Sequence, residues 1–271
     1  MNQKSALILF FGLESPRGVR YHALSRGKAF RHFSYEGALM LNHRRWSALD
    51  GADHGWLKAK HHFAVSAAGN PAHGPLGSLI VWNDDEIAAN SGFPLHGHKD
   101  IEIITYVRQG VVVHQDNLGS IGRIEAGEVQ VMSAGTGIRH SEYNPGNVPL
   151  KIYQIWILPR EPGGKPCWGT KPFPKVDRSG RFVVLASGMP GDDDALSIRA
   201  NGRVLGMTLN SGRSVRYDLD SLRSAYLVVA AGLVTVNGEA VGPLDGLGIT
   251  KESAIDIVAM EDAELVMVDV A

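Results

Sequence analysis

Residues 92–110 read GFPLHGHKDIEIITYVRQG, which places two histidines directly before a β-rich run. His96 and His98 are two residues apart, and the run Ile101–Val107 follows them. Residues i and i+2 of an extended strand project from the same face. We therefore predict a β-strand that points both imidazoles into one interior.

A second pair of candidate ligands lies further along the chain. Residues 132–144 read MSAGTGIRHSEYN and supply His140 and Glu142, again two residues apart. If the two segments meet, three imidazole nitrogens and one carboxylate oxygen converge, a donor set that suits a divalent first-row metal ion with positions left for water or substrate. An H-x-H pair alone is more often a packing feature, so the added H-x-E pair is what favours a metal site.

Two glycines, Gly135 and Gly137, lie on either side of Thr136 just before His140. Glycine tolerates positive φ and a close approach of other backbone. We therefore expect a tight turn that delivers His140 into the interior.

Short β-rich runs recur between Gly, Asn and Asp along the chain. The clearest are Ile101–Val107, Val111–His114, Val129–Ser133, Lys151–Leu158, Phe182–Leu185, Tyr226–Val229, Leu233–Val236 and Leu265–Val268. Short strands with such turn signals are typical of sandwiches and barrels. Apart from a short helix expected at Asp218–Arg223, the pattern predicts an all-β fold.

The chain contains two copies of one plan. Residues 106–113 and 227–236 each read as a strand, a small-residue turn and another strand, and Gly110 aligns with Gly232. No histidine occurs after His140, so histidine chemistry is confined to the first copy.

A linker is expected between the copies, because residues 159–174 hold five prolines and three glycines. This composition resists a helix and the interior of a sheet. We therefore expect a first domain over residues 43–165 and a second over residues 166–271.

Residues 1–42 precede both copies as an N-terminal extension. The first 39 residues hold six Lys or Arg against two Glu, with a short apolar run at residues 6–13. Several interpretations stay open: translation that starts at Met40, an inert and disordered tail, a signal peptide with a poor cleavage site, or another targeting segment.

Composition excludes several classes of protein. A formal net charge of −1 gives no electrostatic case for nucleic acid or an anionic membrane as the main partner. The single cysteine, Cys167, cannot form an intrachain disulfide, which favours the cytoplasm. No apolar run approaches the roughly 18 residues that a membrane helix needs.

Three stretches resemble the pirin family of bicupins: ADHGWLKAKHHF at residues 52–63, VWNDDEIAANSGFPLHGHKDIEIITYV at residues 81–107 and GRIEAGEVQVMSAGTGIRHSEYN at residues 122–144. The resemblance implies two cupin (jelly-roll) β-barrels, face to face in one chain. The first barrel would bind one metal ion, usually taken as iron, and the second would be degenerate. The second half is similar to bacterial pirin-like proteins associated with quercetin 2,3-dioxygenase activity.

The carboxylate ligand has two candidates. General cupins often use the position four residues after H-x-H, which is Glu102 here, and its parity matches that of His98. Pirin-like proteins use the position of Glu142, which we prefer, and Glu102 then becomes a supporting carboxylate. The implied metal ligands are His96, His98, His140 and Glu142.

The resemblance implies an enzyme that cleaves a flavonol such as quercetin with O2. Fe(II) is the expected ion, with Cu, Mn, Ni, Co or Zn as alternatives, and Glu142 the expected general base. Two alternatives stay open: a metal-binding regulator that acts through protein partners, and a dioxygenase for another enol or phenol. Because one chain supplies both barrels, we expect a monomer.

Other side chains near the motifs are expected to be structural. His61, His62 and His114 are interpreted as packed or exposed imidazoles. Apolar residues could line a substrate cavity or form core: Phe93, Ile104, Met132 and Ile138.

Overall fold

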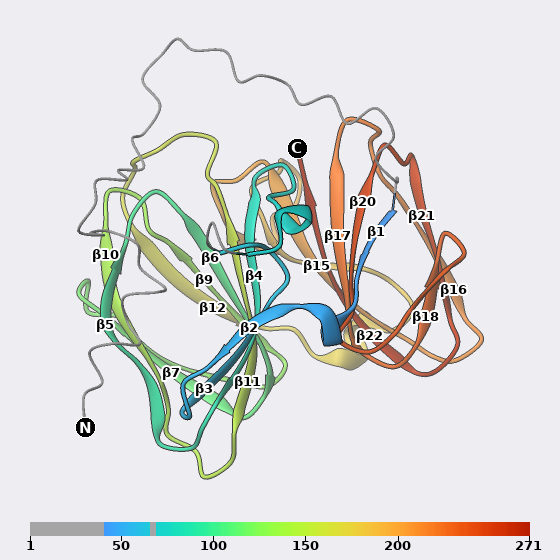
Figure 1. Ribbon diagram of the computed structural model, residues 1–271. Helices are drawn as coiled ribbons and strands as arrows, with labels where there is room; N and C mark the ends of the chain where they lie inside the picture. The colour runs from blue at the N-terminus through green and yellow to red at the C-terminus, as the bar shows by residue number, and fades with distance from the viewer. Residues whose placement is uncertain (1–40, 66–68) are drawn as a thin grey trace. The chain divides into compact units, whose positions relative to one another are not determined.

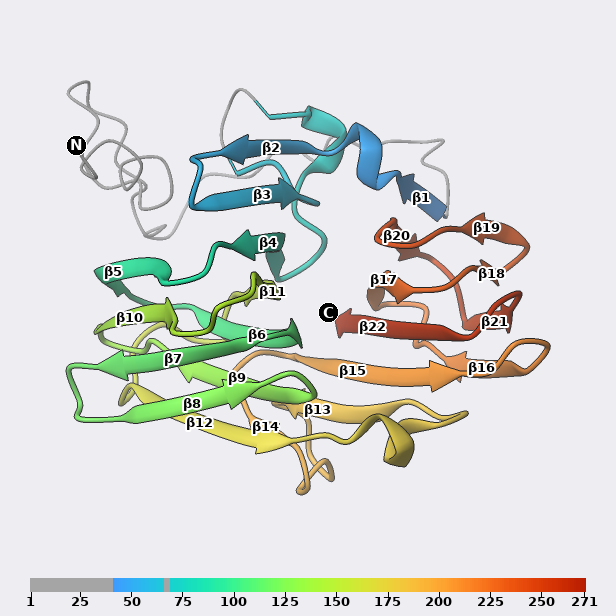
Figure 2. The same cartoon turned by 90° about the horizontal axis from the view of Figure 1, so that it is seen from below.

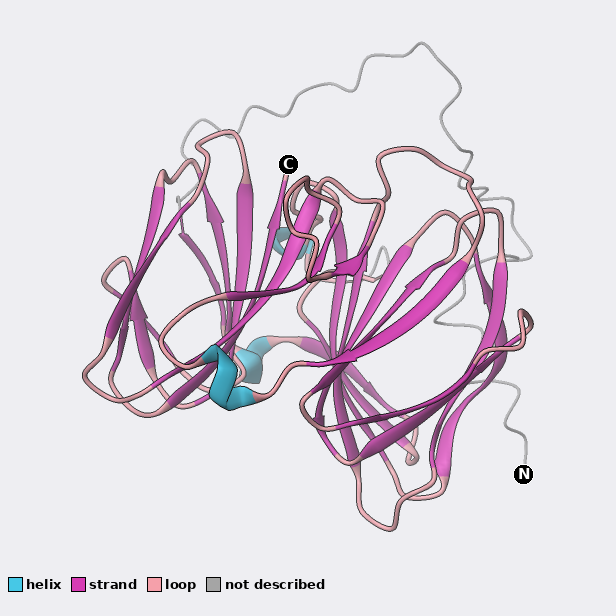
Figure 3. Cartoon of the chain, turned by 180° about the vertical axis from the view of Figure 1, so that it is seen from behind, coloured by secondary structure: helices cyan, strands magenta, loops and turns pink. Residues whose placement is uncertain are grey.

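The computed structural model describes residues 41–65 and 69–271 and is built almost entirely of β-strands (Figure 1). Short 3-10 turns are its only helical elements in these ranges: Trp46–Ala48, Pro71–His73 and Lys175–Arg178 (Figure 3). No helix in the described ranges is long and apolar enough to cross a membrane. Except for its last two positions, the extension expected over residues 1–42 lies outside the described residues.

The first half consists of two sheets. The four-stranded sheet has the order β5 (Ser91–His98), β10 (Ile138–Asn144), β7 (Val111–Asp116), β8 (Ile121–Glu125). The seven-stranded sheet has the order β12 (Cys167–Pro172), β9 (Glu128–Ser133), β6 (Glu102–Gln109), β11 (Leu150–Ile157), β4 (Leu79–Ile87), β3 (Leu57–His61), β2 (Asp50–Asp53).

The second half repeats this arrangement. Its four-stranded sheet has the order β16 (Ser214–Asp218), β21 (Ala254–Ala259), β18 (Val234–Val236), β19 (Glu239–Val241). Its seven-stranded sheet has the order β1 (Leu41–Arg44), β20 (Gly246–Thr250), β17 (Ser224–Ala231), β22 (Ala263–Val270), β15 (Gly202–Leu209), β13 (Val183–Ser187), β14 (Leu196–Ser197). Gly110 and Gly232, which the sequence aligns, both have φ 81°.

Two strands cross the boundary expected at residues 165/166. β12, in the proline-rich linker, pairs antiparallel with β9 of the first half. β1, which precedes the first half, pairs with β20 of the second (Figure 2). β12 is an edge strand, where proline is tolerated because no ladder hydrogen bond is required of it. The linker therefore resists a sheet interior as expected, yet still forms a strand.

The short helix expected at Asp218–Arg223 is absent, and that prediction was wrong. β16 ends at Asp218, and a turn follows in which Asp220 Oδ1 accepts a hydrogen bond from the Leu222 amide at 2.9 Å. Arg223 is held instead by Asp269, with Nε and Oδ1 2.5 Å apart. Side chains that bond nearby backbone compete with helix formation, which explains the turn.

The two seven-stranded sheets share a buried apolar cluster, so the halves meet face to face. It includes Trp82 and Tyr153 from the first half and Tyr226 and Val268 from the second. A separate apolar cluster fills the second half alone and includes Met207, Leu227 and Ile257. The first half differs, because its four-stranded sheet buries histidines and carboxylates. Chemistry is therefore expected in the first half.

Candidate metal centre

The strands β5 and β10 bring the two histidine motifs together. His96 lies directly opposite His140 in the antiparallel register, and Ile138 lies opposite His98. The register then shifts, because Glu142 pairs with Phe93, so β5 carries a bulge around Pro94 and Leu95. Such bulges re-aim side chains and are common beside functional sites.

Three imidazoles form one cluster. The rings of His96 and His140 have centroids 4.4 Å apart, and His98 lies 4.9 Å from His96 and 5.0 Å from His140. One ligand atom of each residue lies within 4.8 Å of the others, so the cluster is able to hold a metal ion. His98 is the half-buried member, and the other two are buried, so the cluster opens toward solvent at His98.

Hydrogen bonds fix the orientation of two of these rings. His96 Nδ1 lies 2.7 Å from the Pro94 carbonyl oxygen, and because a carbonyl only accepts, Nδ1 must carry the proton. His140 Nδ1 lies 3.3 Å from His114 Nδ1. His140 Nε2 is buried and has no hydrogen-bond partner among the described residues. A buried nitrogen without a partner is costly, and a metal ion would satisfy it.

Burial keeps these imidazoles neutral. Desolvation lowers the pKa of His98 to about 3, with a smaller contribution from His96. Desolvation also lowers the pKa of His140, with contributions from the neighbouring histidines. Neutral imidazoles keep the lone pair that a metal ligand needs, so the donor set fits a divalent ion.

Glu142 lies beside the histidine cluster and is joined to it through His140. Its carboxylate belongs to an overlapping group with His114 and His140, whose ligand atoms lie within 4.8 Å of one another. Gln130 donates to Oε1, and Gln154 Nε2 lies 2.5 Å from Oε2. Burial raises the pKa of Glu142 to about 7, despite these two hydrogen bonds.

Glu102, the other candidate carboxylate, belongs to neither group of candidate ligands. Its Oε2 accepts from Ser133 Oγ at 2.5 Å and from the Arg199 amide at 3.2 Å. It therefore ties the first half to the second.

His114 lies beside the cluster, although the sequence analysis did not assign it to the site. It was interpreted as a packed or exposed imidazole, and it is packed: its side chain is fully buried against His140, with ring centroids 5.2 Å apart. It lies directly opposite Glu142 across β7 and β10. The signal was present as His114-x-Asp116, whose two-residue spacing places both side chains on one face of β7.

The apolar residues near the motifs divide between two roles. Phe93 contacts His96, with ring centroids 6.2 Å apart. Ile104 lies in the apolar cluster between the halves, and Met132 and Ile138 pack in a small cluster of their own. Of these four residues, Phe93 is the one with a ring contact to the cluster, and Trp156 also contacts His98, with ring centroids 5.1 Å apart. His61 and His62 are buried, as expected of packed imidazoles.

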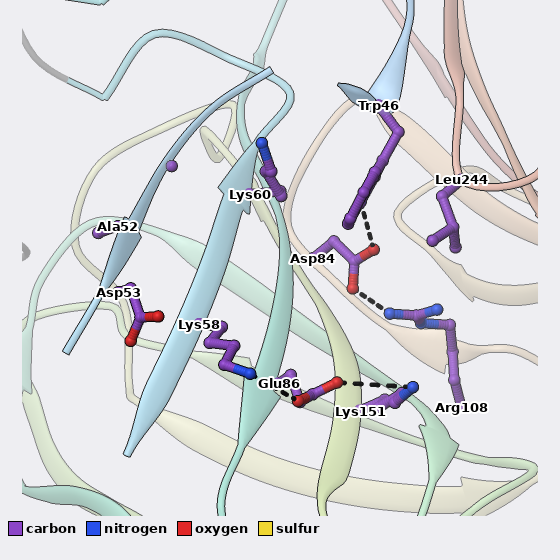
Figure 4. A pocket seen from close by; sticks show the side chains of 11 residues that line it. Trp46, Ala52, Asp53, Lys58, Lys60, Asp84, Glu86, Arg108, Lys151 and Leu244 are labelled. Carbon is purple, nitrogen blue, oxygen red and sulfur yellow. Dashed lines mark hydrogen bonds and ion pairs between the residues drawn. The ribbon is translucent and has the colours of Figure 1, made fainter. Parts of the chain in front are cut away.

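A cavity of about 650 Å³ lies elsewhere, and none of the clustered histidines lines it (Figure 4). Its charged groups are satisfied within the protein. Asp84 accepts from Arg108 and from Trp46 Nε1, and Glu86 lies 3.8 Å from Lys58 and 3.5 Å from Lys151. The histidine cluster, with its unpartnered nitrogen, is therefore the candidate site.

Two jelly-roll halves, of which only the first gathers histidines in its interior, define a bicupin with a candidate metal centre. The chain belongs to the pirin family. The family profile described as Pirin matches residues 42–157, and the profile described as Quercetinase C-terminal cupin domain matches residues 184–270.

Similar proteins cover nearly the whole of both halves. A pirin-like protein of Caulobacter vibrioides is 58% identical over 86% of this chain and 100% of its own length. The quercetin 2,3-dioxygenase of Escherichia coli K12 is 38% identical over 85% of this chain and 98% of its own. The crystal structure of the Escherichia coli pirin YhhW in complex with nickel(II) matches with a TM-score of 0.80 and 37% identity, over 85% of this chain and 99% of that one.

Proposed function

We propose that this chain is a metal-dependent dioxygenase that opens a flavonol such as quercetin with O2. The ligands would be His96, His98, His140 and Glu142, with Fe(II) as the ion. One observation carries the proposal: three neutral imidazoles converge within 4.8 Å, and one of them has a buried nitrogen without a partner.

A bound divalent ion supplies Lewis acidity, which lowers the pKa of a coordinated hydroxyl and orients the resulting anion. The chain's own contribution is to bind the substrate and move its proton. Glu142 accepts the proton of the flavonol 3-hydroxyl, because its carboxylate lies beside His140 and is held in place by Gln130 and Gln154. Half-buried His98 marks the side from which a planar substrate approaches, and Phe93 offers a ring for it to pack against.

The relatives support the same reaction. The Escherichia coli relative carries the name quercetin 2,3-dioxygenase at 38% identity. The YhhW structure holds nickel(II) on a closely similar fold, so ions other than iron need testing.

The test is turnover with defined ions. The protein is freed of metal and reloaded separately with Fe(II), Cu, Mn, Ni and Co. Loss of quercetin absorbance is followed together with release of carbon monoxide. We expect turnover with at least one ion, and its loss in His98→Ala.

Binding of metal without turnover of quercetin or any other flavonol would overturn the proposal and favour a metal-binding regulator. Turnover that survives His98→Ala would contradict the assigned site. A matched control is His43→Ala, because His43 lies outside the cluster and pairs with Glu239 and Asp245.

A further inference from the structure

A chain of three buried side chains runs from β7 to the candidate metal centre. Asp116 Oδ2 lies 3.2 Å from His114 Nε2, and His114 Nδ1 lies 3.3 Å from His140 Nδ1. All three residues are buried, and Asp116 pairs directly with His140 across the strands. The order of contacts is therefore Asp116, His114, His140.

The first contact fixes the proton on His114. Asp116 Oδ1 accepts from the Leu118 amide at 2.8 Å and the Ser120 amide at 3.0 Å. Asp116 Oδ2 faces His114 Nε2, so three hydrogen-bond donors surround the carboxyl and favour its ionised form. An ionised carboxylate only accepts hydrogen bonds, so His114 Nε2 must carry the proton.

The second contact follows from the first. A neutral His114 ring whose proton is held on Nε2 by Asp116 has a lone pair on Nδ1, so that atom is an acceptor. The Nδ1 of His140 must then be the donor across the 3.3 Å contact. This leaves His140 Nε2 with its lone pair, which is the buried nitrogen without a hydrogen-bond partner among the described residues.

The surroundings hold the His114 ring in place. Trp168 of β12 stacks on it, with ring centroids 5.0 Å apart and planes at 13°. Gly122 lies opposite His114 on β8, and a Cβ there would come within 2.2 Å of the Trp168 ring. The glycine therefore makes room for the indole that fixes His114.

We propose that Asp116 and His114 are positioning residues, which lock His140 in the Nδ1–H tautomer and so make its Nε2 the metal-binding atom. The proposal rests on His140 being a ligand, as in the proposed function, but on no particular substrate. Such hydrogen bonds behind a ligating histidine usually change metal affinity about 10- to 100-fold.

Asp116→Asn is the informative variant. Two backbone amides at Oδ1 demand an oxygen there, so the asparagine NH2 would face His114 and donate to it. His114 would then protonate at Nδ1, and His140 at Nε2, the atom that is needed for the metal. In His114→Gln the side-chain amide can donate to Asp116 and accept from His140, so this variant should keep the wild-type tautomer.

The experiment uses 15N-histidine NMR on the metal-free full chain and Co(II) titration of each variant. We expect His140 to be protonated at Nδ1 in the wild type and in His114→Gln, and at Nε2 in Asp116→Asn. Co(II) affinity should fall about 10- to 100-fold in Asp116→Asn, and stay near wild type in His114→Gln. The matched control Gln115→Asn, at the exposed neighbour on the same strand, should change neither quantity.

Wild-type His140 protonated at Nε2, or unchanged tautomer and Co(II) affinity in Asp116→Asn, would overturn the proposal. If Asp116→Asn does not fold, the wild-type and His114→Gln spectra decide the tautomer. If Co(II) binds to no variant, the proposed function fails. The wild-type spectrum still decides whether the hydrogen bonds from Asp116 through His114 set the tautomer of His140.

Discussion

Gln154 Nε2 lies 2.5 Å from Oε2 of Glu142, so a side-chain amide holds the carboxylate in place. The Gln154 amide is itself oriented, because Trp156 Nε1 donates to its Oε1 at 3.2 Å. On the other carboxylate oxygen, Gln130 donates and is in turn oriented by Trp168, with Nε1 and Oε1 2.9 Å apart. Both oxygens of Glu142 therefore accept hydrogen bonds from side-chain amides. Neither amide can exchange its nitrogen and oxygen positions without losing the hydrogen bond from a tryptophan indole.

The first prediction concerns Glu142→Gln. The NH2 group of the new glutamine would face the side-chain NH2 of Gln130 or Gln154. Two donors cannot hydrogen-bond to each other, so the side chain at position 142 would rotate away from its wild-type position. We expect metal affinity to fall at least about 10-fold and quercetin turnover to be lost, as measured by Co(II) titration and substrate absorbance. Glu102→Gln is the matched control, because its amide oxygen can still accept from Ser133 and Arg199. Equal losses in both variants would refute the preference for Glu142.

The second prediction concerns the pH dependence of stability through His62. Desolvation, with Arg44 and Arg108, lowers the pKa of His62 well below 6.5. Below about pH 6.5 the unfolded chain binds a proton that the folded chain does not. The free energy of unfolding should therefore fall as pH falls from about 6.5.

His62→Gln removes the titratable imidazole, so the unfolded chain no longer gains a proton at this position. The glutamine can keep the hydrogen bond to Tyr226. Urea unfolding of metal-free protein at pH 7.5, 6.0 and 5.0 measures the effect. Between pH 6.0 and 5.0 the wild type should lose about 1 kcal/mol more than the variant does. The same loss in both proteins would argue against a neutral His62.

The third prediction concerns the contact between the halves. Glu264 accepts from Tyr106 and lies 3.6 Å from Arg178, whose side chain is buried. Glu264→Gln leaves that guanidinium without a carboxylate, and breaking a buried pair usually costs about 3–5 kcal/mol. Urea unfolding should show the loss. Glu125→Gln serves as control, because the Arg123–Glu125 pair is exposed, and a similar loss there would contradict the role of burial.

The fourth prediction concerns the turn before His140. Gly135 has φ 47°, and a Cβ would lie 2.3 Å from the Gly164 carbonyl oxygen. Gly135→Ala should lower the unfolding free energy and weaken Co(II) binding together, because the turn positions His140. Gly127 also has positive φ, 93°, but open space around its Cβ position. Gly127→Ala should therefore cost less and leave Co(II) affinity unchanged, and a metal affinity loss in this variant would contradict the prediction.

The sequence allowed the two histidine motifs and the strands that carry them to be predicted, because two-residue alternation is a local property. His96 and His98 were placed on a strand by spacing alone, and the duplicated order followed from matching turns at Gly110 and Gly232. The shift between His140 and Glu142 was not predictable, because a bulge depends on the partner strand. The two-residue spacing of His114 and Asp116 was visible in the sequence, but the contacts of His114 with His140 and Trp168 were not, because these residues are distant in sequence.

The two edge strands that cross between the halves make the protein indivisible in a practical sense. A gene cut after codon 165 would give a front fragment without Trp168, and so without the indole that orients Gln130 and stacks on His114. The C-terminal fragment would lack β1, so β20 would become an unpaired edge strand whose backbone could pair with another chain. Each sheet is therefore completed by a strand from the other side of the expected boundary, β12 in the first half and β1 in the second.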